Sequence, residues 1–535
     1  MKKLSTGRKK WIERTVANNR SYKLYLYNRF FIFSLLIIGQ IGISIWLLYL
    51  LFYHTTLGVA LQIVAGGVTL AVALYLINKT ERPTMRLNWI LLILVLPIVG
   101  VPSYLLYGEG RSTRYMRGKM QRAKEENRKV FEDIFGKPTP TMAQTREENV
   151  RYYLESEANY PAYGDGGISY YSNGEELFAE MLKALQSAKR FILLDYFIIA
   201  HGEMWNSILK ILLEKASLGV KIRIIYDDFG CMMTLPPKYD EYLEGLRENI
   251  KCMTFNDVAP FFAIRMNHRD HRKIMVVDGK VAFTGGVNIA DEYIGKKIRF
   301  GHWKDAGVKI TGCAVHSFTR MFFDFWNAFR KDKEDLQEYL IPQKNGGRYE
   351  ANEKKPCIQP FDDTPLDGVS VGESVYADVV NKACRYVYIF TPYLVLDDYM
   401  RSALCSAALR GVDVRIVTPA IPDKKTTFRL TRANYQPLLR AGVKIYEYTE
   451  GFIHSKCMVA DDECAVVGTI NLDYRSLYHH FENAVYFANC EAVLSVKKDC
   501  EETFAISKEC SLKYPKRGAI GRLFDAFLRV FETLF

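Results

Sequence analysis

The protein has 535 residues, which is long for one domain and allows a large hydrophobic core. Hydrophobic residues make up 49% and charged residues 25%, a balance that excludes a largely disordered chain. The formal net charge is +12, but residues 1–29 hold nine Lys and Arg against one acid, Glu13, and so contribute +8. The other residues carry only +4, which argues against a surface that coats nucleic acid. The basic tail at 1–29 favours anionic lipid headgroups instead.

Three apolar segments follow the tail within residues 30–107. Residues 30–52 and residues 57–77 contain no charged side chain. Each is long enough to cross a hydrocarbon layer of ~30 Å as a helix. The sequence therefore predicts N-terminal transmembrane helices and a multi-pass protein of the cell membrane.

The third apolar segment, residues 89–107, contains Pro97, Gly100 and Pro102. These residues interrupt helices and predict a kinked span or a shallow re-entrant segment. The basic tail should stay in the cytoplasm, so three complete crossings would put the rest of the chain outside. Residues 111–129 carry eight basic side chains, which favours the inside. We therefore expect that the third segment does not cross and that the rest of the chain is cytoplasmic.

The rest of the chain contains an internal duplication. Residues 108–150 are strongly charged and predict a helical connector. Apolar strand-like runs then alternate with amphipathic helices in two regions, 151–342 and 357–512, which a polar linker at 343–356 separates. This alternation predicts two α/β lobes, each with a largely buried sheet. Residues 513–535 have apolar side chains at helical spacing, so we expect an amphipathic helix that lies on the membrane surface or packs on the second lobe.

The eleven cysteines lie between Cys231 and Cys510 and include no C-x-x-C pair. Zinc frameworks need such closely spaced pairs, so we expect unpaired thiols in a reducing compartment. The sequence shows no other cluster of metal ligands. We therefore expect neither a metal nor another cofactor.

Each lobe contains one copy of the same polar pattern, HRKIMVVD at 271–278 and HSKCMVAD at 454–461. Side chains two apart on a strand point to the same face, so the His and Lys of each copy should face one site. The Asp, at the far end of the strand, should fix the following turn. Each copy is followed by a Gly-x-x-Asn turn, which brings an amide and backbone N–H groups suited to phosphate oxygens. The candidate residues are His271, Lys273, Asp278 and Asn288 in the first lobe, and His454, Lys456, Asp461 and Asn471 in the second.

One copy supplies half of a phosphate site, and two lobes that meet face to face would complete it. Displacement at a phosphodiester needs a nucleophile on one side of phosphorus and an acid for the leaving oxygen on the other. Two histidines can do both: one attacks phosphorus, and the other protonates the departing alcohol and then deprotonates the incoming one. The lysines and asparagines would hold the non-bridging oxygens. This chemistry needs no metal.

A histidine in such a role needs its second ring nitrogen held, usually by a carboxylate. Two acids occur at suitable places, Asp305 in HWKDAGVKI and Glu482 in HHFENAVYF. Glu482 lies eleven residues after Asn471 in a strand-like run, and Asp305 precedes the same apolar alternation in the first lobe. We therefore predict the pairs His271–Asp305 and His454–Glu482.

The doubled H-x-K-x-x-x-x-D motif resembles that of the phospholipase D superfamily, and the chain is similar to bacterial cardiolipin synthases. The resemblance starts at about residue 60 and includes WILLILVLPIVGVPSYLLYGEG, NHRDHRKIMVVDG with GGVNIADEYIG, and GFIHSKCMVADD with GTINLDYRSL and HFEN. It implies two phospholipase-D-like lobes, each a mixed sheet flanked by helices, around a pseudo-twofold axis. It also implies a membrane enzyme that joins two phosphatidylglycerols into cardiolipin and releases glycerol. The implied intermediate is a phosphatidyl-histidine at His271, with His454 as general acid and base.

The chain departs from the family pattern at two places. It has the additional apolar segment 30–52, and it has Gly286 where many members carry a small hydroxyl residue. The alternatives are a hydrolase that uses water, a transferase with another acceptor, a nuclease and a non-catalytic lipid-binding scaffold. The apolar N-terminal region and the modest charge of the lobes argue against nucleic acid as a partner. Two intact motifs argue against a scaffold, but the sequence does not distinguish water from an alcohol as the acceptor.

Overall fold

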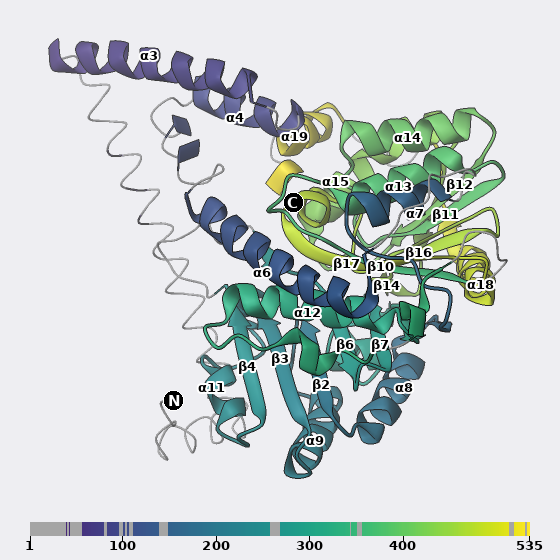
Figure 1. Ribbon diagram of the computed structural model, residues 1–535. Helices are drawn as coiled ribbons and strands as arrows, with labels where there is room; N and C mark the ends of the chain where they lie inside the picture. The colour runs from purple at the N-terminus through teal and green to yellow at the C-terminus, as the bar shows by residue number, and fades with distance from the viewer. Residues whose placement is uncertain are drawn as a thin grey trace.

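The structure is a computed structural model in which two α/β lobes lie against each other, with the N-terminal helices on the outside (Figure 1). It describes residues 56–79, 83–95, 111–137, 148–256, 268–342, 344–349, 356–512, 518–529 and 532–534, with isolated residues between 39 and 105.

The first lobe contains a seven-stranded sheet in the order β1-β9-β7-β6-β2-β3-β4. Strands β2, β3 and β4 are parallel, and the other neighbours are antiparallel, so the sheet is mixed. The strands are β1 Ile168–Tyr171, β2 Phe191–Tyr196, β3 Lys221–Asp227, β4 Ile250–Phe255, β6 Lys273–Val277, β7 Val281–Gly285 and β9 Gly307–Thr311. The helices are α8 Gly174–Ser187, α9 Glu203–Ser217, α10 Asp228–Cys231, α11 Tyr239–Glu244, η2 Asp291–Ile294, α12 Val315–Phe329 and η3 Leu336–Tyr339.

Both faces of this sheet are buried, as alternate residues of β2 show. Ile192 and Leu194 pack in one apolar cluster with α8 and α9. Phe191 and Leu193 pack in the other cluster, which includes α12. Burial on both faces explains why the strand reads as a continuous apolar run in the sequence.

The second lobe repeats this arrangement. Its sheet has the order β10-β17-β16-β15-β11-β12-β13-β18, in which the first seven strands match those of the first lobe one by one. The strands are β10 Cys357–Asp363, β11 Tyr386–Phe390, β12 Asp413–Pro419, β13 Lys444–Tyr448, β15 Cys457–Ala460, β16 Cys464–Gly468, β17 His480–Ala488 and β18 Ser507–Glu509. The helices are α13 Val371–Lys382, α14 Asp398–Leu409, α15 Lys425–Ala433, α16 Tyr435–Arg440, α17 Tyr474–Tyr478 and α18 Glu491–Ala505.

Short parallel strand pairs cross between the lobes. Strand β5, Arg269–Asp270, pairs with the start of β17 in the second lobe. Strand β14, Gly451–Ile453, pairs with β8, His302–Lys304, of the first lobe. Each of these segments directly precedes a residue of the candidate site, so the contact between the lobes fixes the geometry of that site.

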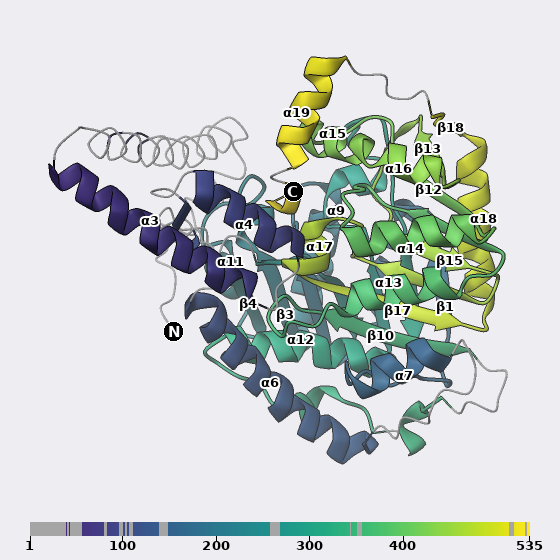
Figure 2. The same ribbon diagram turned by 90° about the horizontal axis from the view of Figure 1, so that it is seen from above.

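The charged helix α6, Arg111–Phe135, is part of the contact between the lobes. It packs along α12 (Figure 2). Its Asn127 donates to Asp324 of α12 at 2.8 Å, and its Lys124 pairs with Asp362 of β10 at 3.0 Å. A second short helix, α7, Glu148–Ser156, packs on β10 and α13. The predicted linker contains a 3-10 turn, η4, Lys344–Gly347.

Helices α3, Thr56–Ile77, and α4, Pro83–Val95, form a separate small cluster in which Leu76 and Ile93 are fully buried. The predicted segment 30–52 lies outside the described residues, apart from three isolated positions. In the part of the chain that the structure describes, no helix is both long and apolar enough to cross a membrane.

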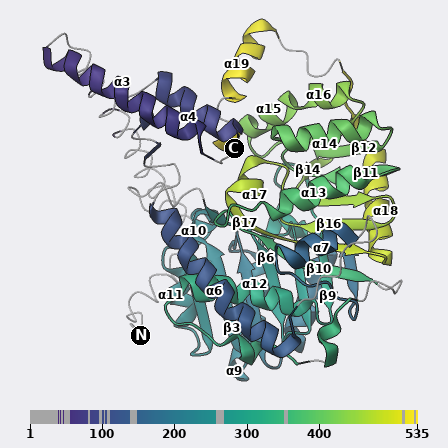
Figure 3. The ribbon, with the colours of Figure 1, turned by 45° about the horizontal axis from the view of Figure 1, so that its top comes forward.

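The C-terminal helix α19, Ala519–Arg529, packs on the second lobe at α15 (Figure 3). Arg429 of α15 pairs with Asp525 of α19 at 2.5 Å, and Leu528 is buried. The following turn, η5, Glu532–Leu534, contacts α17, and Thr533 accepts a hydrogen bond from Asn88 of α4 at 3.2 Å. The C-terminal segment therefore links the second lobe to the N-terminal helices.

None of the eleven cysteines forms a disulfide, and seven of them are buried. The prediction of unpaired thiols is confirmed. Burial raises the pKa of several of them, including Cys231 and Cys313, so these thiols behave as small apolar side chains.

Candidate functional site

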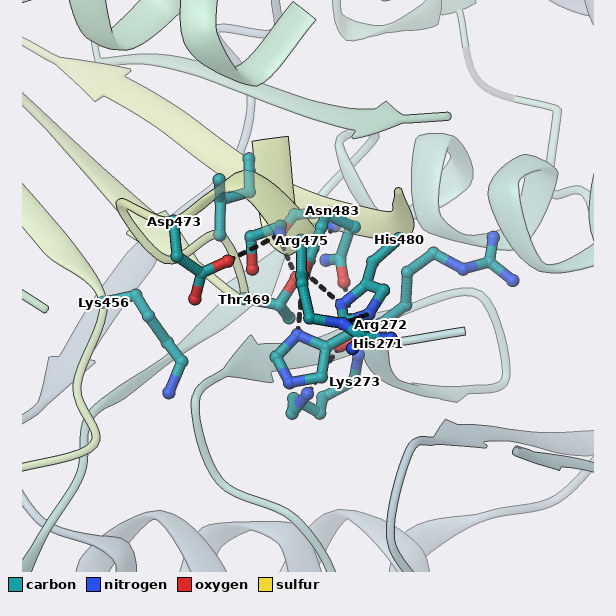
Figure 4. Close-up of polar contacts among 12 residues, drawn as sticks. His271, Arg272, Lys273, Lys456, Thr469, Asp473, Arg475, His480 and Asn483 are labelled. Carbon is teal, nitrogen blue, oxygen red and sulfur yellow. Dashed lines mark hydrogen bonds and ion pairs between the residues drawn. The ribbon is translucent and has the colours of Figure 1, made fainter. Parts of the chain in front are cut away.

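The two His/Lys pairs meet where the lobes contact each other. His271 and Lys273 lie at the start of β6, and His454 and Lys456 lie just before the equivalent strand β15. All four are buried, and the charge of Lys456 in the second lobe acts on the His271 imidazole in the first. Figure 4 shows Lys273 beside His271, with Lys456 of the other lobe to their left. The structure thus brings the two copies of the motif to one place.

The carboxylates pair with the histidines across the lobes. Nδ1 of His271 lies 2.9 Å from both carboxylate oxygens of Glu482, and Nδ1 of His454 lies 2.6 Å from Oδ2 of Asp305. The predicted pairs His271–Asp305 and His454–Glu482 were therefore wrong, although the four side chains are those that the sequence indicated.

The crossed strand pairs give the physical reason. In the register of β5 and β17, Asp270 lies opposite Phe481, so the next residues, His271 and Glu482, face each other. The register of β14 and β8 does the same for the other pair, and the backbone N–H of His454 donates to Lys304 at 2.7 Å. In each strand pair, the residue that follows on one strand is the histidine and the residue that follows on the other is the carboxylate. The parallel pairing therefore places each carboxylate at the imidazole of the other lobe.

The two carboxylates are held differently. The Thr469 hydroxyl donates to Oε2 of Glu482. Gly286 occupies the corresponding place in the first lobe, and a Cβ there would lie 2.0 Å from Oδ1 of Asp305. The departure from the family pattern at Gly286 thus leaves room for Asp305, where a hydroxyl residue would displace it.

Burial sets the ionisation of the histidines. Burial and then the charge of Lys456 lower the pKa of His454 to about 4, while burial and Lys273 hold the pKa of His271 well below its usual range. Both imidazoles are therefore neutral at pH 7. With Nδ1 held by a carboxylate, each can present the lone pair of Nε2 to a substrate.

The two lysines also lose part of their charge through burial. Nζ of Lys273 donates to the backbone oxygen of His271 at 2.5 Å, and Nζ of Lys456 donates to that of His454. Burial lowers the pKa of Lys273 to about 8 and that of Lys456 to about 7. Two buried ammonium groups next to each other favour an anion between them, because an anion offsets the cost of burying their charge.

The two asparagines lie in equivalent positions after β7 and β16. Oδ1 of Asn288 accepts from the Ile198 backbone at 3.1 Å, and its amide donates to the Tyr293 hydroxyl at 2.8 Å. One amide proton of Asn288 then remains for a ligand. Oδ1 of Asn471 is buried and has no hydrogen-bond partner among the described residues.

The two aspartates of the motifs hold backbone and lie away from the imidazoles. Asp278 and Asp461 both have φ +55°, a left-handed conformation that begins the turn after the strand. Their carboxylates also accept hydrogen bonds from the residues that start the neighbouring strand, which the sequence had not indicated. These donors are the backbone N–H groups of Lys189, Arg190 and Phe191 for Asp278, and of Cys384, Arg385 and Tyr386 for Asp461.

Two residues at the site were missed in the sequence. His480 lies 5.5 Å from His271 between ring centroids, and Trp303 lies 5.7 Å from His454. His480 precedes Glu482 by two residues, and Trp303 precedes Asp305 by two. Strand periodicity could have indicated both, because side chains two apart share a face.

Among the described residues, one group has the donor atoms for a metal ion. His271, His480 and Glu482 place their ligand atoms within 4.8 Å of one another. Arg475 donates to His480 at 3.3 Å, and Lys273 acts on the same imidazole. These positive charges disfavour a cation and favour an anionic ligand at this place.

The sequence is similar to family models and to known proteins whose names agree with a phosphodiester site. A family model described as "Cardiolipin synthase, PLD-like domain" matches residues 181–298 and 376–504, and one described as "Phospholipase_D-nuclease N-terminal" matches residues 67–109. A cardiolipin synthase of Alkalihalophilus pseudofirmus is 32% identical, covering 85% of this chain and 90% of that protein. This chain belongs to the cardiolipin synthase family. The family's members are enzymes that transfer phosphatidyl groups, and this chain is one of them.

One further relative and one solved structure are also similar to this chain. An uncharacterized protein of Streptococcus mutans is 43% identical over 81% of this chain and 93% of its own length. Phosphatidylserine synthase of Haemophilus influenzae has the same two-lobed fold, with a TM-score of 0.54 and 14% identity, covering 72% of this chain and all of that one. At this identity the likeness concerns the fold. It agrees with the mixed sheets flanked by helices that the sequence predicts for each lobe.

Proposed function

We propose that the protein is a cardiolipin synthase, which transfers the phosphatidyl group of one phosphatidylglycerol to a second one and releases glycerol. The observation that carries this proposal is the pair of neutral histidines from two lobes, each held by a carboxylate of the other lobe, with a buried lysine that donates to the backbone oxygen of each histidine. The negative charge of a phosphodiester would balance the positive charges of the two buried lysines.

In the first step, Nε2 of His271 attacks phosphorus. The bond from phosphorus to the glycerol oxygen breaks, and that oxygen takes a proton from Nε2 of His454. The products are free glycerol and a phosphatidyl group bound to His271. The negative charge of the bound phosphodiester raises the pKa of His454, so Nε2 of this imidazole takes up a proton from solvent when the substrate binds and then gives it to the glycerol oxygen.

In the second step, His454 acts as a base. Its Nε2 takes the proton of the terminal hydroxyl of a second phosphatidylglycerol, whose oxygen bonds to phosphorus. The bond between phosphorus and His271 breaks, which gives cardiolipin and restores the imidazole. One phosphodiester has replaced another, so the reaction needs no nucleotide and no metal.

The remaining polar side chains would stabilise the phosphate. The ammonium groups of Lys273 and Lys456, the free amide proton of Asn288 and the amide of Asn471 would hold the non-bridging oxygens. Such donors act most strongly where charge develops in a site that excludes water. Asp278 and Asp461 would act only by holding the strands that carry these groups.

We propose that the N-terminal region attaches the enzyme to the cell membrane, with the lobes on the cytoplasmic side. Support comes from the match of residues 67–109 to the family's N-terminal model and from apolar side chains such as Ile63 and Val64, which are 72% and 63% exposed on α3. The basic tail at 1–29 would add attraction to anionic lipids. Carbonate extraction of membranes tests the attachment, and protease access to the lobes in inside-out vesicles tests their side.

Purified protein in micelles with labelled phosphatidylglycerol as the only lipid tests the reaction. Cardiolipin and glycerol in equal amounts support the proposal. Phosphatidic acid would identify a hydrolase, and no turnover would indicate a scaffold. A His271→Ala variant should lose activity, and one that keeps full activity would contradict His271 as the nucleophile.

A further inference from the structure

The two histidines have different surroundings. Around His454 lie the rings of Tyr293, Trp303 and Phe452, at 5.5, 5.7 and 5.9 Å between centroids. We call these three residues the aromatic wall. Nothing comparable surrounds His271, whose ring neighbours among the described residues are Phe197 at 5.0 Å and His480 at 5.5 Å.

The aromatic wall is built by both lobes. Trp303 on β8 lies opposite Phe452 on β14, and their rings are 4.9 Å apart. Tyr293 packs against Trp303 at 5.0 Å. The same strand pair places Asp305 at His454, so the wall and the carboxylate are fixed together.

The wall combines apolar rings with two hydrogen-bond donors. Nε1 of Trp303 is buried and has no hydrogen-bond partner among the described residues. The Tyr293 oxygen accepts from the Asn288 amide, so the Tyr293 O–H can still donate. Asp305 is used by His454 and by the backbone N–H of Ala306. A ligand that has both hydroxyl groups and carbon atoms can bind these donors and cover the rings at the same time.

An alcohol fits the same place better than water. Its hydroxyl can donate to Nε2 of His454 while its carbon atoms pack on the aromatic rings. The contact removes apolar surface from water, which stabilises the alcohol and gives nothing to a water molecule.

We propose that the aromatic wall is the binding subsite for the glycerol group, both for the glycerol that leaves and for the second phosphatidylglycerol that enters. This proposal rests on the proposed function and names the residues that select the acceptor. The wall favours an alcohol over water as the acceptor, which is the choice that separates a transferase from a hydrolase. Trp303 and Phe452 are its specificity-determining residues.

The experiment measures how the phosphatidyl-enzyme divides between its two fates. Labelled phosphatidylglycerol is given to the wild-type protein and to the Trp303→Ala and Phe452→Ala variants, and cardiolipin and phosphatidic acid are separated. We expect the ratio of phosphatidic acid to cardiolipin to rise about tenfold in each variant, the range that one apolar contact can discriminate. The affinity for added glycerol in the reverse reaction, from cardiolipin to phosphatidylglycerol, should fall in the same variants.

Phe197→Ala is the matched control, because it removes a ring that packs on the other histidine. Its product ratio should stay that of the wild type, and Trp303→Phe should restore most of the wild-type ratio. An unchanged ratio in folded Trp303→Ala and Phe452→Ala proteins would overturn the proposal, as would an equal rise in Phe197→Ala. If Trp303→Ala does not fold, Phe452→Leu gives the same comparison. A wild-type protein that makes no cardiolipin would instead reject the proposed function.

Discussion

Glu482 in the second lobe contacts Nδ1 of His271 in the first lobe through both carboxylate oxygens, at 2.9 Å each. Asp305 in the first lobe makes the reciprocal contact with His454 in the second. Neither lobe therefore contains a complete pair of histidine and carboxylate. The docking of the lobes creates the site.

The crossed pairs predict that Glu482→Gln and Asp305→Asn affect different steps. A phosphatidyl ester of p-nitrophenol separates them, because this leaving group needs no acid. Glu482→Gln should slow release of p-nitrophenol by roughly 10²-fold, since it disturbs the nucleophile. The Asp305→Asn variant should release one equivalent of p-nitrophenol quickly. The phosphatidyl-enzyme should then accumulate, since the base for the second step is impaired.

Radiolabelled protein denatured in detergent at neutral pH, where the bond between phosphorus and histidine survives, shows which variant carries the phosphatidyl group. His271→Ala is the control and should carry none. If Glu482→Gln accumulates the labelled intermediate and Asp305→Asn fails to form it, the pairs act within each lobe and the crossed arrangement is wrong.

The buried Lys456 predicts a loss of activity in alkaline solution. Its pKa of about 7 means that the free enzyme loses this positive charge as the pH rises through that value, so binding of the anionic substrate weakens above it. The pH dependence of kcat/KM, which reports the free enzyme, should fall on its alkaline side from about pH 7. In Lys456→Arg this fall should move to higher pH, because a guanidinium stays charged. An alkaline limb that does not move would assign it to another group.

Gly286 should tolerate no side chain. A Cβ would lie 2.0 Å from Oδ1 of Asp305, so Gly286→Ala should push this carboxylate away from His454 and lower kcat by roughly 10²-fold. Gly118→Ala in α6 is the matched control, because a Cβ there meets nothing within 4 Å. The control should keep activity and gain up to about 1 kcal/mol of stability. Equal activity in the two variants would show that the contact with Asp305 is not required.

Arg272 should be a determinant of stability. It lies between β5 and β6 in the chain and is fully buried. Its guanidinium pairs with Asp195 at 2.8 Å and with Asp270 at 2.9 Å. Arg272→Met leaves both carboxylates without their cation and should lower the free energy of unfolding by about 3–5 kcal/mol. Thermal unfolding measures the change.

The duplicated motif offers the control for this experiment. Ser455 occupies the position of Arg272 in the second copy, and its hydroxyl has no hydrogen-bond partner in the part of the chain that the structure describes. Ser455→Ala should change stability by less than about 0.5 kcal/mol. A loss in Ser455→Ala as large as that in Arg272→Met would mean that packing, and not charge, sets the cost.

Much of the candidate site could be predicted from local sequence. The spacing of His271 and Lys273 on a strand places both on one face, and the second copy at His454 and Lys456 repeats it. The same local patterns predicted two α/β lobes, because strand and helix periodicity depend on residues that are neighbours in the chain. The aspartates at the strand ends were expected to hold structure for the same reason.

The membrane region shows where local sequence patterns are not sufficient. The length of the charge-free segments predicts that residues 30–52 and 57–77 cross the membrane. The structure describes only isolated residues of the first segment, and the second forms helix α3. The crossings therefore stay a prediction.

What the sequence by itself determined are the reacting side chains and the class of their chemistry. What only the tertiary structure decided is which carboxylate serves which histidine, and that aromatic rings lie at His454. These relationships depend on the register of parallel strands from different lobes, such as Asp270 opposite Phe481. Such pairing joins residues that are far apart in the chain, and the period of two along one strand does not determine which strand of the other lobe will lie beside it.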